Sequence, residues 1–395
     1  MTANGGMNRR PANAKIRKSR GRERHGITGF RLHYSLAALP GGIPLSPPPA
    51  MRFQDIHLHT VAASLPPRVL TSLQLEERLA PLYQRLHLAE GRLELMTGIH
   101  ERRFWHQGTL PSDAATQAAR VALEQSGMDA SRIQALLYCG VSRDCVEPAT
   151  STAVVRNLGL RRDTLNFDLS NACLGMANAI AVMAAMLASG QVECAMAVTG
   201  ENAGPLVENT IRRLNQDDSL TRQALKEEFA SLTIGSAAAA IILTRQGGHP
   251  ILAMGQASDC QCDDLCRGDA AGGMTEGSAP VMHTDSQRLL EEGVTVAQRM
   301  WQDLCREAPW GDGGLPDLVC GHQVSKAHRD LLFQRLGLPL DRDFPIFPAT
   351  GNCGSASLPL ALAMAQKAGA LRPGMQLALL GIGSGINSLG FALQW

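Results

Sequence analysis

The chain has 395 residues and a formal charge of +1. This value conceals a division, because residues 1–50 carry +8 and the remaining 345 residues carry −7. An acidic body with only 4% aromatic residues argues against a phosphate-tracking groove or a base-stacking platform, so no nucleic-acid partner is expected. No apolar run reaches the roughly 20 residues of a membrane helix, so no integral membrane segment is expected. The ten cysteines lack the spacing of a small disulfide scaffold, which favours a reducing, cytoplasmic compartment.

Residues 1–50 are basic and then rich in Gly and Pro, with neither a helical nor a strand period. We predict a disordered basic extension. An alternative is that Met51 is the true start and that this extension is not part of the protein.

From Met51 onward, short apolar runs alternate with helical patterns, which predicts α/β layering around a mostly buried sheet. In chain order, the predicted strands are Met51–His59, Ala135–Gly140, Leu165–Leu169, Ala195–Gly200, Ala237–Thr244, Leu318–Gly321 and Gln376–Gly381. The predicted helices are Thr71–Leu88, Asp113–Gly127, Leu174–Ser189, Ser286–Arg306 and Ser355–Gly369.

Residues 51–395 also contain a sparse internal repeat. Cys139-Gly140 recurs as Cys320-Gly321, 181 residues later, and the same offset takes Asn171 to Asn352. The identities are sparse, but both halves read as strand, Asn-led turn, Ala-rich helix and second strand. We therefore predict two duplicated halves packed together, residues 51–245 and 246–395.

Cys173 lies in Asn171-Ala172-Cys173-Leu174-Gly175, between a predicted strand and the Ala-rich helix. A helix N-terminus lowers the pKa of a thiol, and its free amides stabilise an oxyanion. Cys173 is therefore a candidate nucleophile, and the alternative is a small buried hydrophobic residue, as most cysteines are.

His322 directly follows the strand that ends at Gly321, and Asn352 precedes a helix in Gly351-Asn352-Cys353-Gly354-Ser355. Alone, each has an ordinary interpretation, a structural histidine and a helix N-cap. If the two halves are duplicated, these two turns lie opposite the turn that contains Cys173. The three residues are then a candidate Cys/His/Asn set for acyl transfer.

Three further motifs have no strong functional interpretation. Gly381-Ile382-Gly383-Ser384-Gly385 lacks the spacing and the downstream unit of a dinucleotide fingerprint, so NAD binding is rejected. Cys260, Cys262 and Cys266 have no second paired cluster, so no metal is expected and surface-loop cysteines are predicted. Arg102-Arg103 is compatible with either a phosphate or acidic side chains as its partner.

Glu147 lies in Ser142–Pro148, just after a predicted strand. By itself, a loop carboxylate is usually only solvated.

Taken together, Asn-Ala-Cys-Leu-Gly, Gly-His-Gln-Val-Ser, Gly-Asn-Cys-Gly-Ser-Ala-Ser and Gly-Ile-Gly-Ser-Gly resemble the thiolase superfamily, and most closely the β-ketoacyl-ACP synthase III branch. The resemblance covers about residues 51–395. It implies the thiolase fold, a five-layer αβαβα core of two halves, and a homodimer. It also implies that Cys173 is acylated, that His322 and Asn352 are catalytic, and that the Cys173 and Ser384 amides form the oxyanion hole.

Two branches of this superfamily use different carbanion sources. Fatty-acid-initiating enzymes decarboxylate malonyl-ACP and need no base. A second branch condenses two acyl-CoAs head to head, in olefin or β-lactone biosynthesis, and uses a glutamate inserted from the neighbouring subunit. Its segment resembles Ser142–Pro148, with Glu147 at the position of the base. Ser325–His328 also differs from the Asn-x-Arg-Ile of the initiating enzymes.

The head-to-head branch is therefore favoured. We expect the protein to be an acyltransferase that needs no cofactor and uses coenzyme A thioesters as substrates. Two alternatives stay open. One is a decarboxylative synthase III that uses acyl-CoA and malonyl-ACP, with an acyl carrier protein as partner. The other is a non-catalytic thiolase-fold subunit.

Overall fold

The computed structural model describes residues 51–268, 280–310 and 314–395. The predicted basic extension lies outside the described residues. Residues 48–395 form one compact unit, so the two predicted halves are not separate globules.

Ten described strands form one hydrogen-bonded path, in the order β12-β13-β14-β9-β2-β8-β7-β5-β6 with β1 beside β9. β2 and β9 pair at only two positions, so the path consists of two sheets joined at one corner. The first sheet contains β2 (His57–Ser64), β5 (Ala135–Tyr138), β6 (Leu165–Asp168), β7 (Cys194–Glu201) and β8 (Ala237–Thr244). The second contains β1 (Met51–Arg52), β9 (His249–Ser258), β12 (Leu318–Gly321), β13 (Gln376–Gly383) and β14 (Asn387–Gln394).

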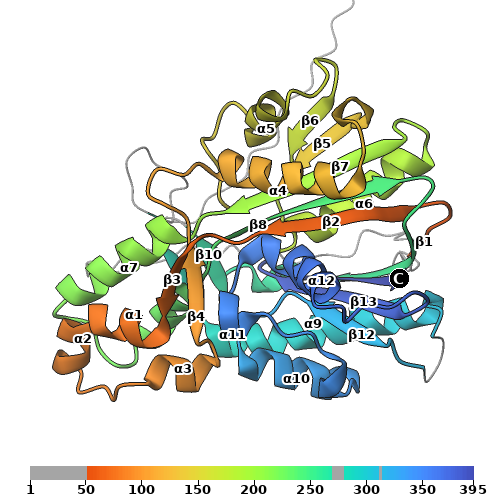
Figure 1. Ribbon diagram of the computed structural model, residues 1–395. Helices are drawn as coiled ribbons and strands as arrows, with labels where there is room; N and C mark the ends of the chain where they lie inside the picture. Colours follow the sequence, from red (N-terminus) through yellow and green to blue (C-terminus); the bar gives the residue numbers. More distant parts are fainter. Residues whose placement is uncertain (1–50, 269–279, 311–313) are drawn as a thin grey trace, which may run out of the picture. The chain divides into compact units, whose positions relative to one another are not determined.

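Helices cover both outer faces and fill the space between the sheets (Figure 1). α6 (Gly175–Ala188) and α12 (Ser357–Lys367) lie between the sheets and contact each other. α4 (Pro111–Ser126) and α5 (Thr150–Leu158) cover the first sheet, while α9 (Ser286–Glu307) covers the second, with α10 (Lys326–Leu336) packed on α9. The five layers are therefore αβαβα, the thiolase fold.

Each interface between layers has its own apolar core. The central one surrounds α6 and α12, whose buried side chains include Met183, Leu187 and Leu360. A run of alanines in α4 packs on the first sheet, and the apolar face of α9 packs on the second. α6 is apolar on most sides because it packs against both sheets and against α12.

A smaller region lies beside these layers, around a core of its own that includes Leu75 and Leu93. Its elements are β3 (Arg68–Thr71), β4 (Glu101–Phe104), α1 (Ser72–Arg78), α2 (Ala80–Arg85), α3 (Arg92–Thr97), α7 (Gly204–Gln216) and α8 (Leu225–Glu228). The hairpin strands β10 (Cys266–Gly268) and β11 (Met282–Thr284) and the short α11 (Phe347–Thr350) complete the described helices and strands.

The strand order reads alike outward from the β2–β9 corner. On one side the order is β2, β8, β7 and β5, and on the other β9, β14, β13 and β12. In both series two antiparallel pairs are followed by a parallel one. The division into duplicated halves at residue 246 stays a prediction, and this symmetry is compatible with it.

Two predicted elements were wrong in detail. The expected strand Met51–His59 is two segments, because β1 ends at Arg52 and β2 begins only at His57. The expected helix Thr71–Leu88 is interrupted at Leu79, where Pro81 begins a new helix, since proline favours a first turn and disrupts an interior one. Among the described residues, no helix is long and apolar enough to cross a membrane.

Candidate functional site

Cys173 lies in the turn between β6 and α6. Ala172, before it, has a positive φ of 45°, and the Leu174 N–H donates to the Asn171 carbonyl at 2.8 Å. A non-glycine residue with positive φ is uncommon and marks a backbone held by its surroundings. Cys173 itself is partly exposed, as a nucleophile that receives a substrate must be.

Gly175 allows this turn to approach the end of the first sheet. A Cβ at this position would lie 2.1 Å from the Cys139 carbonyl oxygen. The next residue, Met176, donates its N–H to the Ser355 hydroxyl at 2.9 Å. The Cys173 turn is therefore tied both to the end of β5 and to the turn after Asn352.

The expected low pKa of the Cys173 thiol is wrong for the free protein. Burial, with smaller contributions from the nearby Cys266 and Glu201, raises the pKa of Cys173 to about 12. Desolvation penalises the thiolate more than a helix N-terminus favours it. The thiol therefore rests protonated and must lose its proton as the substrate binds or reacts.

We expect alkylation of Cys173 by iodoacetamide in the free protein to accelerate about tenfold per pH unit from about pH 6 to 9, because only the thiolate reacts. The measurement is the Cys173 peptide by mass spectrometry, which separates it from the exposed Cys145 and Cys260. A rate that reaches a plateau below pH 7 would contradict the raised pKa.

His322 immediately follows β12, and its N–H donates to the Leu380 carbonyl of β13 at 2.8 Å. The side chain is 4% exposed. Burial, with a smaller effect of the nearby His328, lowers the pKa of His322 to about 3. The imidazole is therefore neutral at neutral pH, and it can offer a hydrogen bond without carrying a charge.

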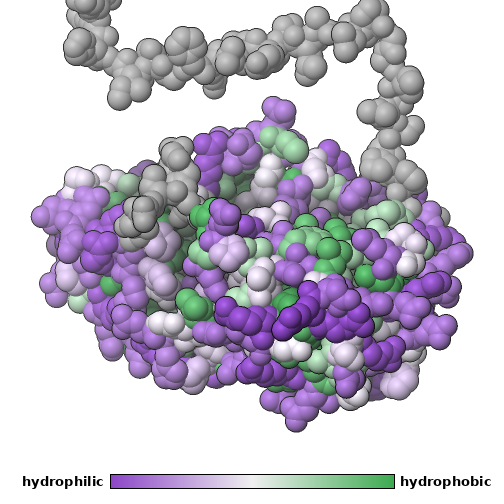
Figure 2. Space-filling view, turned by 90° about the horizontal axis from the view of Figure 1, so that it is seen from above, coloured by the Kyte–Doolittle hydropathy of each residue, from purple (hydrophilic) through white to green (hydrophobic). Residues whose placement is uncertain are grey.

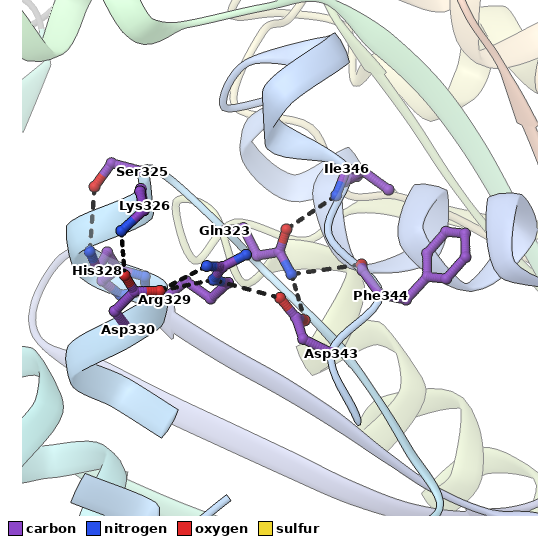
Figure 3. Close-up of polar contacts among 9 residues, drawn as sticks. All are labelled: Gln323, Ser325, Lys326, His328, Arg329, Asp330, Asp343, Phe344 and Ile346. Atoms are coloured by element: carbon purple, nitrogen blue, oxygen red, sulfur yellow. Dashed lines mark hydrogen bonds and ion pairs between the residues drawn. The ribbon is translucent and has the colours of Figure 1, made fainter. Parts of the chain in front are cut away.

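Gln323 anchors the loop that begins at His322 (Figure 3). Its amide donates to Asp343 Oδ1 at 2.7 Å and its carbonyl oxygen accepts the Ile346 N–H at 3.0 Å. Burial raises the pKa of Asp343 to about 7, which Arg329 partly opposes. This buried pair connects the His322 loop to the segment that leads to Asn352.

Asn352 is held on three sides. Its N–H donates to the Thr233 carbonyl at 2.9 Å, and its carbonyl accepts the Gly235 N–H at 2.8 Å. Its side-chain Oδ1 accepts the Gly354 N–H at 2.9 Å. With Oδ1 occupied, the side-chain NH₂ group has no hydrogen-bond partner among the described residues and remains free to donate to a substrate.

Ser384 follows β13, whose end lies against the Cys173 turn. A Cβ on Gly383 would meet the Leu174 side chain at 2.8 Å and the Leu174 nitrogen at 3.6 Å. Asn387 Nδ2 donates to Asn171 Oδ1 at 3.2 Å, and Asn171 Nδ2 donates to Asn178 Oδ1 at 2.7 Å. These contacts hold the end of β13 against the turn that contains Cys173, an arrangement compatible with the oxyanion role predicted for the Ser384 amide.

Glu147 lies on the exposed tip of the loop between β5 and α5. Its side chain forms no hydrogen bond or ion pair with another described residue. Val141 and Val146 on the same loop are 57% and 69% exposed. The structure does not join Glu147 to the other three residues within one chain, and its role in a neighbouring subunit stays a prediction.

Figure 2 views the molecule from the side of α4 and α5, where apolar areas interrupt a mainly hydrophilic surface. Two other exposed apolar side chains, Leu110 before α4 and Leu165 of β6, are 48% and 41% exposed. Leu110 lies beside the Glu147 loop, because the Ser112 N–H donates to Asp144, whereas Leu165 lies at the opposite end of β6 from that loop. Exposed apolar side chains that gather on one face are typical of a surface that receives a partner.

Three other sequence predictions can now be placed. Of the cysteine trio, Cys260 is exposed, Cys262 is buried and Cys266 is a partly buried residue of β10, so only Cys260 fits a surface-loop cysteine. Arg102 is fully buried and donates to the Ser72 hydroxyl, and Arg103 pairs with Glu101. Within the described residues, no group of three or more His, Cys, Asp or Glu side chains is placed to hold a metal ion.

Sequence reasoning missed Glu201, the last residue of β7. The Glu201 carboxylate is buried and accepts backbone N–H groups of Val141, Ser142 and Ser355. A glutamate at the end of an otherwise apolar strand was the available signal, because a buried carboxylate needs several donors.

Comparison with known proteins shows the class of enzymes to which this architecture belongs. Residues 316–395 match the family of the 3-oxoacyl-[acyl-carrier-protein (ACP)] synthase III C-terminal region. A Xanthomonas campestris OleA structure with a replaced cysteine superposes with a TM-score of 0.82 at 34% identity, covering 87% of this chain and 98% of that one. Cerulenin-bound OleA matches with a TM-score of 0.81 at 35% identity and the same coverage. The fold and this match define a β-ketoacyl-ACP synthase III-like enzyme of the thiolase superfamily, an acyltransferase.

Relatives that align over nearly their full length show to which family within this class the chain belongs. An acyl-CoA:acyl-CoA alkyltransferase from Shewanella oneidensis is 36% identical, covering 87% of this chain and all of its own. The protein of that name from Xanthomonas campestris is 35% identical with the same coverage. A β-ketoacyl-ACP synthase III from Bordetella petrii is 28% identical over 82% of this chain and 93% of its own. The chain belongs to the acyl-CoA:acyl-CoA alkyltransferase family.

Proposed function

We propose that this protein condenses two fatty acyl-CoA thioesters head to head, without decarboxylation, through an acyl-thioester on Cys173. The observation that carries the proposal is the free carboxylate of Glu147 on an exposed loop. Decarboxylation of a malonyl group creates a carbanion without a base, whereas an unactivated acyl-CoA must lose an α-proton to one. The full-length identity to acyl-CoA:acyl-CoA alkyltransferases supports the same assignment.

In the first half-reaction, the Cys173 sulfur attacks the carbonyl carbon of an acyl-CoA, and the thiol proton leaves with the coenzyme A thiolate. The negative charge of the tetrahedral intermediate develops on the former carbonyl oxygen. The backbone N–H groups of Cys173 and Ser384 are the proposed donors to this oxygen, and fixed donors of this kind stabilise charge without rearranging.

In the second half-reaction, Glu147 removes an α-proton from a second acyl-CoA. The resulting enolate oxygen accepts hydrogen bonds from the neutral His322 and from the free NH₂ group of Asn352. The α-carbon then attacks the acyl carbonyl and expels the Cys173 thiolate. The proton held by Glu147 is released to solvent and the thiolate takes up a proton, which restores both groups. The product is a β-ketoacyl-CoA, which yields a β-keto acid on hydrolysis of its thioester.

Several features accompany this proposal. The working unit is a homodimer, because Glu147 serves the partner's site. The substrates are fatty acyl-CoAs, with an acyl carrier protein as an alternative acyl donor, and the reaction needs no metal or further cofactor. The two halves of the chain, divided near residue 246, contribute Cys173 on one side and His322 with Asn352 on the other. The proposed location is the cytoplasm.

The test is a competition between the two carbanion sources. The protein is incubated with myristoyl-CoA and malonyl-ACP together, and the CO₂ released and the products are measured. We expect no CO₂ from malonyl-ACP and a product that contains two myristoyl chains. Carbon dioxide equal to the product formed, with a myristoyl chain lengthened by two carbons, would instead establish the decarboxylative synthase. If neither product nor acyl-Cys173 forms, the non-catalytic alternative stands.

A further inference from the structure

Glu201 is a buried carboxylate at the end of β7, 5% exposed. It accepts the N–H groups of Val141 at 2.9 Å, Ser142 at 3.1 Å and Ser355 at 3.2 Å. Because an ionised carboxylate has about four acceptor sites and no donor, it can satisfy all three amides at once. A glutamine would bring two N–H donors into the same cluster of donors.

The three amides belong to two different loops. Val141 and Ser142 begin the loop whose exposed tip is Glu147. Ser355 lies three residues after Asn352, and its hydroxyl also accepts the Met176 N–H at the start of α6. One carboxylate therefore connects the root of the Glu147 loop to the Asn352 turn, which is itself bonded to the helix that follows Cys173.

The remainder of the Glu147 loop is held by two further carboxylates. Asp144 accepts the Ser112 N–H at 2.8 Å, at the start of α4. Residues 145–148 are exposed, and the far end of the loop is held where the Thr150 and Ser151 N–H groups donate to the Asp168 carboxylate at 2.9 Å each. The two ends of the loop therefore set the direction in which Glu147 projects, and Glu201 holds the first of these ends.

We propose that Glu201 is a positioning residue for the condensation step, because it fixes the root of the Glu147 loop against the Ser355 turn. The inference rests on the proposed function, in which Glu147 removes an α-proton in the partner's site. Acylation of Cys173 does not use Glu147, so loss of Glu201 should slow condensation far more than acylation.

The first experiment is Glu201→Gln in the full chain. We expect the initial rate of Cys173 acylation by myristoyl-CoA, followed by intact mass, to fall by no more than about twofold from the wild-type rate. Condensation should fall about 100-fold, since a shift of about 1 Å in a reacting group costs this much. An equal loss in both half-reactions would overturn the proposal.

Glu76 provides a matched control. It is also a buried glutamate, 3% exposed, and it accepts the backbone N–H groups of Gly91 and Leu93 in the region around α1 and α3. Glu76→Gln should leave the ratio of condensation to acylation unchanged. If Glu76→Gln shifts this ratio as Glu201→Gln does, the effect is a general one of buried carboxylates, and the proposal fails.

Mixed dimers test whether Glu201 acts on the site of its own chain or on the site of the partner. In a dimer of a Glu201→Gln chain and a Cys173→Ala chain, the single nucleophile receives Glu147 from the chain with intact Glu201. We expect condensation per Cys173 to recover to near the wild-type value. Absence of recovery would mean that Glu201 acts within its own site, which contradicts the proposal.

Two further results separate this inference from the proposed function. If the wild-type protein does not condense acyl-CoAs, the proposed function itself fails. If Glu201→Gln does not fold, Glu201→Asp keeps the charge but shortens the side chain by one methylene. The same selective loss of condensation in Glu201→Asp would support the positioning role, and parallel losses would overturn it.

Discussion

Glu147→Ala should lower the rate of acyl-CoA condensation by roughly 100- to 10,000-fold, the usual contribution of a general base. Acylation of Cys173 should continue at the wild-type rate, because Glu147 takes no part in that half-reaction. The variant should therefore accumulate as the acyl-protein when it is mixed with myristoyl-CoA. Intact mass measures the adduct, and chromatography measures the product.

The structure indicates that Glu147→Ala should remove the carboxylate without disturbing the fold. Glu147 is exposed and has no hydrogen bond to another described residue, so its truncation should not change the stability of the chain. Glu193→Ala, another exposed glutamate between α6 and β7, is the control and should condense normally. A Glu147→Ala protein that condenses at the wild-type rate would show that the base lies elsewhere.

Cys173→Ala should abolish both the acyl adduct and the product. The thiol is the only group that we propose to bond covalently to the first acyl chain, so no other residue can take its place. The change removes one sulfur atom from a partly exposed turn, which should leave the fold intact. Intact mass after exposure to myristoyl-CoA should show the unmodified chain.

The exposed Cys260 supplies the control for this variant. Cys260→Ala should acylate and condense as the wild type does. A stoichiometric acyl adduct on the Cys173→Ala protein, located on another cysteine by peptide mapping, would show that the nucleophile is misassigned.

Prediction from sequence was most accurate where elements are buried on both faces. Ala237–Thr244 and Leu318–Gly321 were predicted with the bounds of β8 and β12, because a continuous apolar run between two layers has few other interpretations. β9 and β14 were missed. Gly255 and Gly390 interrupt them where α9 approaches closely, and a glycine within a strand weakens the sequence signal.

The candidate site also contains residues that could be predicted from the sequence and residues that could not. The turns of Cys173, His322 and Asn352 carry distinctive local motifs, so each could be singled out from the sequence, and their joint action stays a prediction. Glu201 could not be, because its partners Val141 and Ser355 are about 60 and 154 residues away. The thiol pKa was predicted with the wrong sign, because the helix N-terminus is visible in the sequence whereas the desolvation of Cys173 is not.

The most direct test of the account uses myristoyl-CoA as the sole substrate of the purified protein. We predict one β-keto product that contains both acyl chains, with two coenzyme A molecules released for each product once its thioester is hydrolysed. Formation of the acyl adduct on Cys173, without any condensed product at any enzyme concentration, would contradict head-to-head condensation as the function of this protein.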